Sequence, residues 1–388
     1  MPKRDDASVI QLVDSLVKNA VIRSASDIHV ESTPAGARIR YRIDGVLYDQ
    51  DVVPRSLMNQ VISRIKILAN INIAEKRIPQ DGKFRISLDG NDIDLRVSTF
   101  PSIHGQKVVV RILDRSTTMI NLEALGFSKG ILTTFKELVH RSSGFFLVTG
   151  PTGSGKTTTL YAALSALNTP EKNIITLEDP VEYNLSGITQ GQIHPAAGFT
   201  FEKGIRAILR QDPDIAMIGE IRDKQTAQIA IEAALTGHVV FSTLHTNDAP
   251  GAIMRLMDMG IEPFLINAAL TGVLAQRLAR KICDNCRESY APNEEEKKLL
   301  SQFSVSFKQL YRGKGCDTCF HLGYSGRVGI FELLVMTSDI RSLIVHRPIF
   351  DAIYQQARSD GMQTLRNDGI KKVETGAISL RELGRTIL

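Results

Sequence analysis

The stretch GFFLVTGPTGSGKTTTLYAAL, residues 144–164, joins an apolar run to a glycine-rich turn and then to a helix-forming segment. The turn matches the pattern G-x-x-x-x-G-K-[ST], in which glycines let backbone N–H groups wrap phosphates at the start of a helix. In such a loop Lys156 neutralises the β- and γ-phosphates, and the Thr157 hydroxyl coordinates Mg²⁺. The alternative, a plain glycine-rich turn, leaves the Lys-Thr pair after an apolar strand unexplained. The predicted phosphate-binding residues are Gly150, Pro151, Thr152, Gly153, Ser154, Gly155, Lys156, Thr157 and Thr158.

The same apolar pattern recurs further along the chain. The later segments are NIITLED, IAMIGE and HVVFSTL, and helical stretches separate them. Strands of this kind are buried on both faces, as in a parallel sheet that helices cover. This part of the chain is therefore predicted to be α/β.

The length of 388 residues exceeds what one hydrophobic core supports, so we expect two domains. The first part combines amphipathic helical stretches with alternating strands such as ARIRYRID, which predicts a smaller α+β domain. The predicted boundaries are residues 1–113 for the α+β domain, 114–126 for a linker, and 127–388 for the phosphate-loop domain, with an insert at about 281–330 and closing helices.

Acidic residues follow two of the apolar runs. ITLEDPVEY offers Glu178, Asp179 and Glu182, and GEIRD offers Glu220. In a doubly wound sheet the ligand lies beyond the carboxyl ends of the strands, so these carboxylates should converge on the phosphate loop. There they can hold a metal ion and orient or deprotonate an attacking water. The alternative is that they are solvated turn acids or helix caps.

GHVVFSTLHTND places His238 and His245 at the two ends of another apolar strand. A histidine near a strand end is more often a structural residue than a functional one, and spacing does not separate the two possibilities.

The four cysteines form two C-x₂-C pairs, Cys283 with Cys286 and Cys316 with Cys319. Each pair can place two thiolates on one cation, and Zn²⁺ accepts four sulfurs with no open position. The pattern predicts a structural zinc site rather than a catalytic one. Free thiols are the alternative.

Charge and hydropathy exclude several classes of protein. The net charge of +5 is mild for this length, and no dense block of Lys and Arg indicates a nucleic-acid partner. The first residues show no signal peptide and no membrane anchor, and no later stretch is apolar enough to span a bilayer. We therefore expect a cytoplasmic protein.

Taken together, these residues resemble the secretion ATPase superfamily, and within it the general secretion pathway protein E family of type II secretion and type IV pilus assembly motors. The resemblance covers nearly the whole chain. Its N-terminal motifs are ASDIHVE, RYRIDGVL, AEKRIPQDG, RVST and VVVRILD, and its later ones are GPTGSGKTTTLYAAL, ITLEDPVEY, AILRQDPDIAMIGEIRD, TGHVVFSTLHTND and LAQRLARKIC. The resemblance implies a RecA-like ATPase domain after a PAS-like α+β domain.

The resemblance also implies roles for single residues. Glu182 resembles the general base, with Glu178 and Asp179 beside it. Glu220 resembles a carboxylate that helps to hold Mg²⁺, and His245 resembles a histidine near the γ-phosphate.

Two residues of the first domain resemble arginines that reach a nucleotide held by the second domain. They are Arg96 in LRVST and Arg111 in VRILD. Ordinary strand surface charge is the alternative for both.

At the level of the assembly, the resemblance implies a hexameric ring that uses ATP, Mg²⁺ and Zn²⁺ and acts at the cytoplasmic side of an inner-membrane platform. A motor for DNA uptake or conjugation, or a nucleotide-switched scaffold with little turnover, would use the same core. Members of this branch commonly carry a further N-terminal docking domain, which we expect either to be lacking or to lie ahead of residue 1. A cysteine insert is typical of secretion and assembly motors, whereas retraction motors generally lack one.

Overall fold

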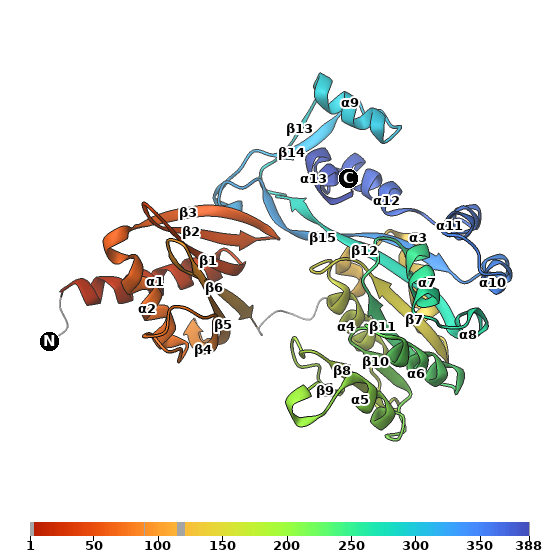
Figure 1. Ribbon diagram of the computed structural model, residues 1–388. Helices are drawn as coiled ribbons and strands as arrows, with labels where there is room; N and C mark the ends of the chain where they lie inside the picture. Colours follow the sequence, from red (N-terminus) through yellow and green to blue (C-terminus); the bar gives the residue numbers. More distant parts are fainter. Residues whose placement is uncertain (1–3, 89, 115–120, 388) are drawn as a thin grey trace. The chain divides into compact units, whose positions relative to one another are not determined.

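The computed structural model describes residues 4–88, 90–114 and 121–387. The chain divides into two compact units, Met1–Thr118 and Met119–Leu388 (Figure 1). Part of the predicted linker, residues 115–120, lies outside the described residues. Within its remaining part, Leu122–Leu125 form a short 3-10 helix, η1, whose Leu122 is buried in a core cluster of the second unit.

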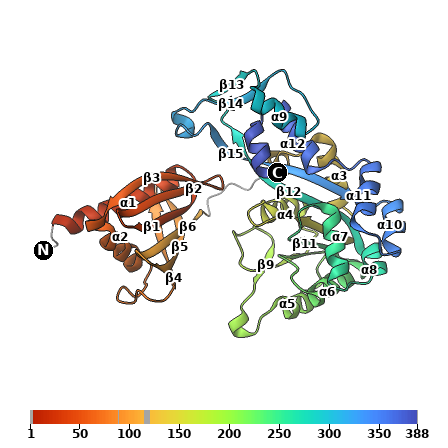
Figure 2. The same ribbon diagram turned by 45° about the horizontal axis from the view of Figure 1, so that its top comes forward.

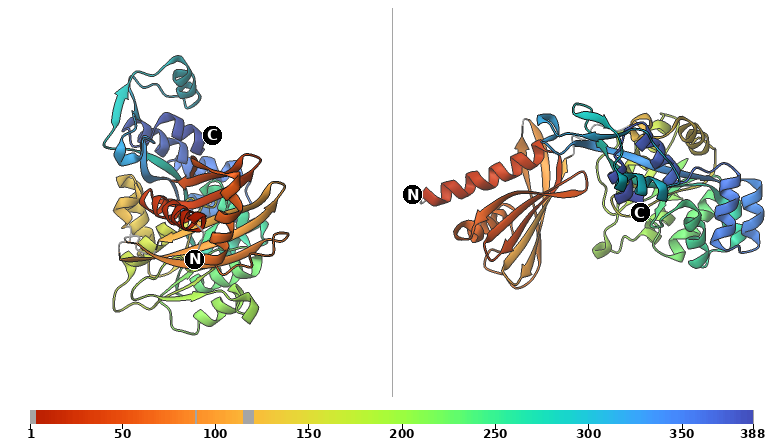
Figure 3. Two further views of the ribbon diagram at one scale, coloured as in Figure 1. Left: turned by 90° about the vertical axis from the view of Figure 1, so that its left-hand side faces the viewer. Right: turned by 90° about the horizontal axis from the view of Figure 1, so that it is seen from above.

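The first unit is a six-stranded antiparallel sheet with strand order β3-β2-β1-β6-β5-β4. Alternate residues such as Ile39 and Tyr41 are buried, because two amphipathic helices pack on the sheet (Figure 3). The Tyr41 hydroxyl donates to the carbonyl oxygen of Leu16 in the first helix at 2.7 Å. The elements are α1 (Arg4–Ile22), β1 (Ala25–Thr33), β2 (Gly36–Ile43), β3 (Val46–Pro54), α2 (Arg55–Leu68), β4 (Gln80–Leu88), β5 (Asn91–Ser102) and β6 (Gly105–Asp114).

The second unit has a seven-stranded sheet with strand order β15-β12-β7-β11-β10-β8-β9. All neighbouring pairs are parallel except β12 with β15, so the sheet is mixed but largely parallel. Its strands are β7 (Gly144–Thr149), β8 (Ile174–Glu178), β9 (Thr189–Gln192), β10 (Ile215–Ile218), β11 (Val239–Leu244), β12 (Leu270–Ile282) and β15 (Tyr324–Val335). The predicted α/β class is confirmed, whereas no strand was predicted at β12 or β15.

Both faces of this sheet are covered by helices, which explains why the strands β7, β8, β10 and β11 are largely apolar and buried (Figure 2). In β7, Phe146 and Val148 join one core cluster with residues of α3 (Lys129–Val139) and α4 (Lys156–Leu167). Phe145 and Leu147 join the other cluster. The helices of that second layer are α5 (Phe201–Ile208), α6 (Lys224–Leu235), α7 (Ala249–Asp258) and α8 (Pro263–Ala269), and a 3-10 turn, η2 (Pro195–Ala197), precedes them.

The segment between β12 and β15 carries the cysteines and a small antiparallel pair of strands. Its elements are β13 (Arg287–Tyr290), α9 (Glu294–Gln302), β14 (Leu310–Gly313) and η3 (Asp317–Cys319). Four helices close the chain: α10 (Ser338–Val345), α11 (Phe350–Ser359), α12 (Leu365–Glu374) and α13 (Leu380–Ile387). The fully buried Glu382 anchors α13 to β12, because its carboxylate accepts hydrogen bonds from the Arg280 guanidinium at 2.7 and 3.0 Å. Among the described residues, no helix combines the length and the apolar character needed to cross a membrane.

Candidate functional site

The phosphate loop lies between the carboxyl end of β7 and the first turn of α4. Gly150 has φ 151° and Gly155 has φ 87°, values that L residues with a side chain rarely adopt. A Cβ atom at Gly150 would lie 2.5 Å from the carbonyl oxygen of Gln276, so the close approach of β12 also requires glycine there. The loop residues Gly150 to Lys156 therefore have the geometry of a helix-start phosphate cradle.

Lys156 is buried against this loop. Its ammonium group donates to the carbonyl oxygens of Gly150 at 2.8 Å and Pro151 at 3.1 Å. Burial lowers the pKa of Lys156, the charge of Arg277 adds to that effect, and Glu220 opposes it. The ammonium is thus held by carbonyl oxygens of the loop itself, and Thr157, the first hydroxyl of α4, is the next residue along the chain.

The parallel strands bring further predicted residues to the same edge of the sheet. Glu220 follows β10 and His245 follows β11, which pairs directly with β7. His245 Nε2 lies 3.3 Å from Glu220 Oε2, and Arg222 donates to the other oxygen of this carboxylate. His238 lies before β11, where its Nδ1 is 2.9 Å from the carbonyl oxygen of Ala233, as expected of a structural residue.

The two glutamates of ITLEDPVEY have different surroundings. Glu178, the last residue of β8, is 3% exposed, and its carboxylate accepts hydrogen bonds from Thr176 at 2.6 Å and Gln190 at 3.1 Å and from the Tyr161 hydroxyl. Glu182 is exposed on the loop that follows, as is Asp179. Of the two glutamates, Glu182 has the carboxylate that a water molecule can reach.

Sequence reasoning missed Arg277 on β12. Its guanidinium is half-buried and donates to the carbonyl oxygen of Asn247 at 2.8 Å. Asn247 lies two residues after His245, so Arg277 contacts the segment that carries this histidine. Thr149, the last residue of β7, contacts the same segment after β11. Its hydroxyl lies 2.8 Å from the Thr246 hydroxyl and accepts a hydrogen bond from the Thr246 N–H at 2.9 Å. No local motif marks these residues, because they meet only when β12 and β11 flank β7.

Arg96 and Arg111 belong to the first unit. They lie directly opposite each other on β5 and β6, on the exposed face of the sheet. Arg111 Nε lies 3.1 Å from Asp27 Oδ1, and its side chain is still 64% exposed. Two like charges in register disfavour the sheet, and the Asp27 carboxylate opposite Arg111 offsets one of them.

The four cysteines form a compact cluster, with all sulfurs within 4.8 Å of one another. Sγ of Cys316 lies 3.9 Å from that of Cys283 and 3.8 Å from that of Cys319, which in turn lies 3.8 Å from that of Cys286. Four sulfurs bound tetrahedrally at about 2.3 Å from zinc are about 3.8 Å apart, so the cluster fits the ion. Backbone N–H groups of Gly315 and Gly323 also point at the sulfurs, as suits thiolates.

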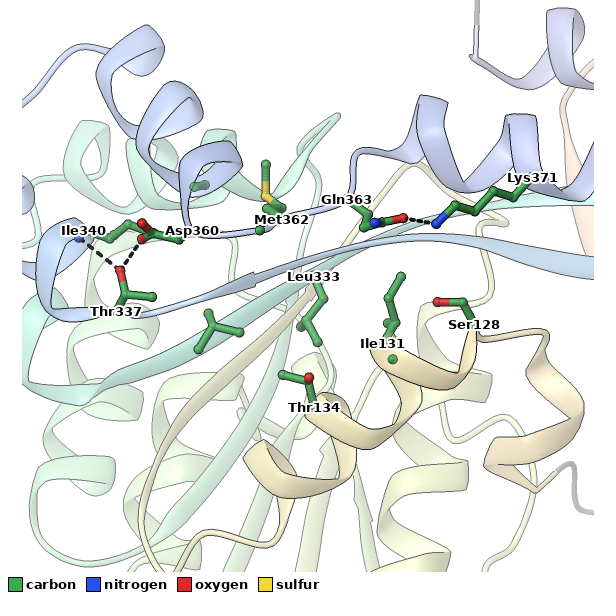
Figure 4. A pocket seen from close by; sticks show the side chains of 14 residues that line it. Ser128, Ile131, Thr134, Leu333, Thr337, Ile340, Asp360, Met362, Gln363 and Lys371 are labelled. Atoms are coloured by element: carbon green, nitrogen blue, oxygen red, sulfur yellow. Dashed lines mark hydrogen bonds between the residues drawn. The ribbon is translucent and has the colours of Figure 1, made fainter. Parts of the chain in front are cut away.

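A cavity of about 440 Å³ lies elsewhere in the second unit, among α3, the end of β15 and α10 to α12 (Figure 4). Four of its labelled polar residues bond in pairs, Thr337 to Asp360 and Lys371 to Gln363. None of the predicted site residues lines it.

The phosphate loop joins a strand of a largely parallel sheet to a helix, and carboxylates lie at the ends of neighbouring strands. This arrangement defines the class of RecA-like P-loop ATPases. The chain belongs to the family described as Type II/IV secretion system protein, whose sequence profile matches residues 2–385. The predicted family is thereby confirmed, and the relatives described below confirm the predicted ATPase function. The predicted cofactors, ATP with Mg²⁺ and zinc, agree with this family and with the four-cysteine cluster.

Two relatives align with almost all of the chain. The type II secretion system ATPase E of Vibrio cholerae serotype O1 is 48% identical over 99% of this chain and 76% of its own length. The type IV pilus assembly ATPase PilB of Thermus thermophilus is 47% identical over 99% of this chain, which spans 43% of PilB. Among solved structures, the pilus retraction motor PilT with bound ADP has a TM-score of 0.61 at 26% identity, covering 95% of each chain.

Removing one thiolate tests the cysteine cluster. We expect Cys286→Ser to lower the zinc content of the purified protein and the melting temperature, because a structural zinc site contributes folding free energy to its surroundings. Ser301→Ala, on the exposed end of α9, is the control and should keep both values. Elemental analysis measures the zinc content. A parent protein that contains no zinc, has four titratable thiols and melts at the same temperature as Cys286→Ser would contradict the assignment.

Proposed function

We propose that this chain is the ATP-driven motor of a type II secretion pseudopilus or a type IV pilus assembly machine. In this proposal it works as a hexameric ring at the cytoplasmic side of an inner-membrane platform. The observation that carries the proposal is the grouping of Lys156, Glu220 and His245 at one sheet edge, in a chain that aligns over 99% of its length with a secretion ATPase and with a pilus assembly ATPase.

The proposed chemistry follows from the charges and exposure at this edge. Mg²⁺ bound with ATP would neutralise charge that develops on the phosphate oxygens. The Thr157 hydroxyl and the Glu220 carboxylate are the oxygen donors that suit this ion. Lys156 binds the β- and γ-phosphates, and Glu182 takes the proton of the attacking water. His245, held by Glu220, lies near the γ-phosphate.

Arg96 and Arg111 would act as arginine fingers in this mechanism. A planar guanidinium matches phosphate oxygens in pairs, and an exposed pair of arginines in register presents two of them together. We propose that they reach the γ-phosphate only when the ring assembles, with the arginines and the phosphate loop supplied by different subunits.

The first test separates binding from hydrolysis. Lys156→Ala should weaken nucleotide binding and abolish hydrolysis, because it removes the cation that faces the phosphates. Glu182→Gln should keep binding but slow turnover by about a hundredfold or more, because an amide accepts no proton. Phosphate release and the binding of a fluorescent ATP analogue measure the two effects, and parental turnover in Glu182→Gln would reject Glu182 as the base.

The second test asks which subunit supplies the arginines. Mixed rings of Arg96→Ala and Lys156→Ala chains should regain turnover, since some interfaces then combine an intact arginine with an intact phosphate loop. Arg96→Lys should be as inactive as Arg96→Ala, because a lysine side chain lacks the planar, forked guanidinium group. Arg38→Ala is the control and should keep the parental rate, because the parent residue is on β2, two strands away from Arg111 in the sheet order, and pairs with Asp49 of β3.

Native mass measurement confirms that mixed rings form. Absence of recovery at every mixing ratio would show that each arginine acts within its own chain. Full activity in Arg96→Ala and Arg111→Ala alone would reject the finger role.

A further inference from the structure

The loop that carries Glu182 has little backbone structure of its own. It runs from Asp179 to β9 without a helix or strand. Side chains from other elements instead accept its backbone N–H groups: the Tyr161 hydroxyl accepts that of Glu182 at 3.4 Å, and Gln190 Oε1 accepts that of Leu185 at 2.7 Å. Gln192 Oε1 accepts the N–H of Val181 at 3.2 Å. The position of Glu182 therefore depends on side chains of α4 and β9.

These side chains converge on the buried carboxylate of Glu178. Tyr161 donates its hydroxyl proton to Glu178, and Gln190 Nε2 lies 3.1 Å from Glu178 and 3.3 Å from the Tyr161 oxygen. Burial, aided by the Glu178 charge, raises the pKa of Tyr161, so the hydroxyl remains a donor to Glu178 and an acceptor for the loop. Charge-assisted hydrogen bonds in a dry interior are strong, so this cluster is a firm anchor.

Tyr161 also ties the loop to the phosphate cradle. It lies on α4 four residues after Thr157, so both side chains project from the same face of the helix one turn apart. The helix begins at Lys156, so one rigid element carries the phosphate-binding ammonium, the metal-binding hydroxyl and the hydroxyl that holds Glu182.

We propose that Tyr161 and Gln190 are positioning residues that fix Glu182 relative to the phosphate loop, with Glu178 as their anchor. This inference rests on the proposed role of Glu182 as the base. It assigns Glu178 a structural task, which explains why a carboxylate at the end of a strand next to the site is saturated with hydrogen bonds and closed to solvent.

The test is Tyr161→Phe in the full chain, with Tyr183→Phe as the matched control. The two rings are in edge contact at 4.7 Å, and among the described residues the Tyr183 hydroxyl forms no hydrogen bond. Tyr161→Phe should lower kcat by about tenfold to a hundredfold through misplacement of Glu182. Its dissociation constant for an ATP analogue should stay within about twofold of the parent, since the phosphate contacts remain. Tyr183→Phe should leave both values unchanged.

A double-mutant cycle separates positioning from general damage. In a Glu182→Gln background, Tyr161→Phe should cause no further loss in single-turnover hydrolysis, because there is no base left to position. Gln190→Leu should behave in the same way and serves as the second variant if Tyr161→Phe melts early. The proposal is overturned if Tyr161→Phe keeps the parental kcat, or if its loss is undiminished without Glu182. If Glu182→Gln alone turns over at the parental rate, it is the base assignment that fails.

Discussion

The parallel pairing of β7 with β11 and β12 is the constraint on which the site depends. Because parallel strands end at the same edge, this pairing sets the phosphate loop beside His245 and brings the Gln276 backbone against Gly150. Continuing the sheet through β10 and β8 adds Glu220 and Glu178. The apolar burial that makes the strands pair thus also assembles the polar groups.

Three glutamates near this edge differ in surroundings, and we propose a different task for each. Glu178 is buried and saturated by donors, Glu220 is partly exposed and bonded to Arg222 and His245, and Glu182 is exposed on a loop. A saturated buried carboxylate serves as an anchor, a partly shielded one suits a metal ion, and an accessible one can take a proton from water. In the proposed mechanism the three glutamates therefore divide the work through burial and hydrogen bonding.

The sequence predicts those strands and turns whose signal lies within a short segment of the chain. The strands β7, β8, β10 and β11 and the turn between Gly150 and Lys156 were recognisable, because each signal lies within one short segment. The pair β12 and β15 was not, because the cysteine-bearing segment separates two strands whose pairing depends on distant contacts. The links of Tyr161 to Gln190 and of Thr149 to Thr246 join residues 29 and 97 positions apart, and no spacing rule reveals them.

The division of tasks among the carboxylates is tested most directly by metal binding in the presence of a non-hydrolysable ATP analogue. Mn²⁺, followed by electron paramagnetic resonance, can stand in for Mg²⁺. The account predicts that Glu220→Gln and Thr157→Ala weaken Mn²⁺ binding by about tenfold or more, as loss of an oxygen ligand or its support does. Glu182→Gln should bind Mn²⁺ as the parent does. Unchanged binding in Glu220→Gln, or an equal loss in Glu182→Gln, would contradict the account.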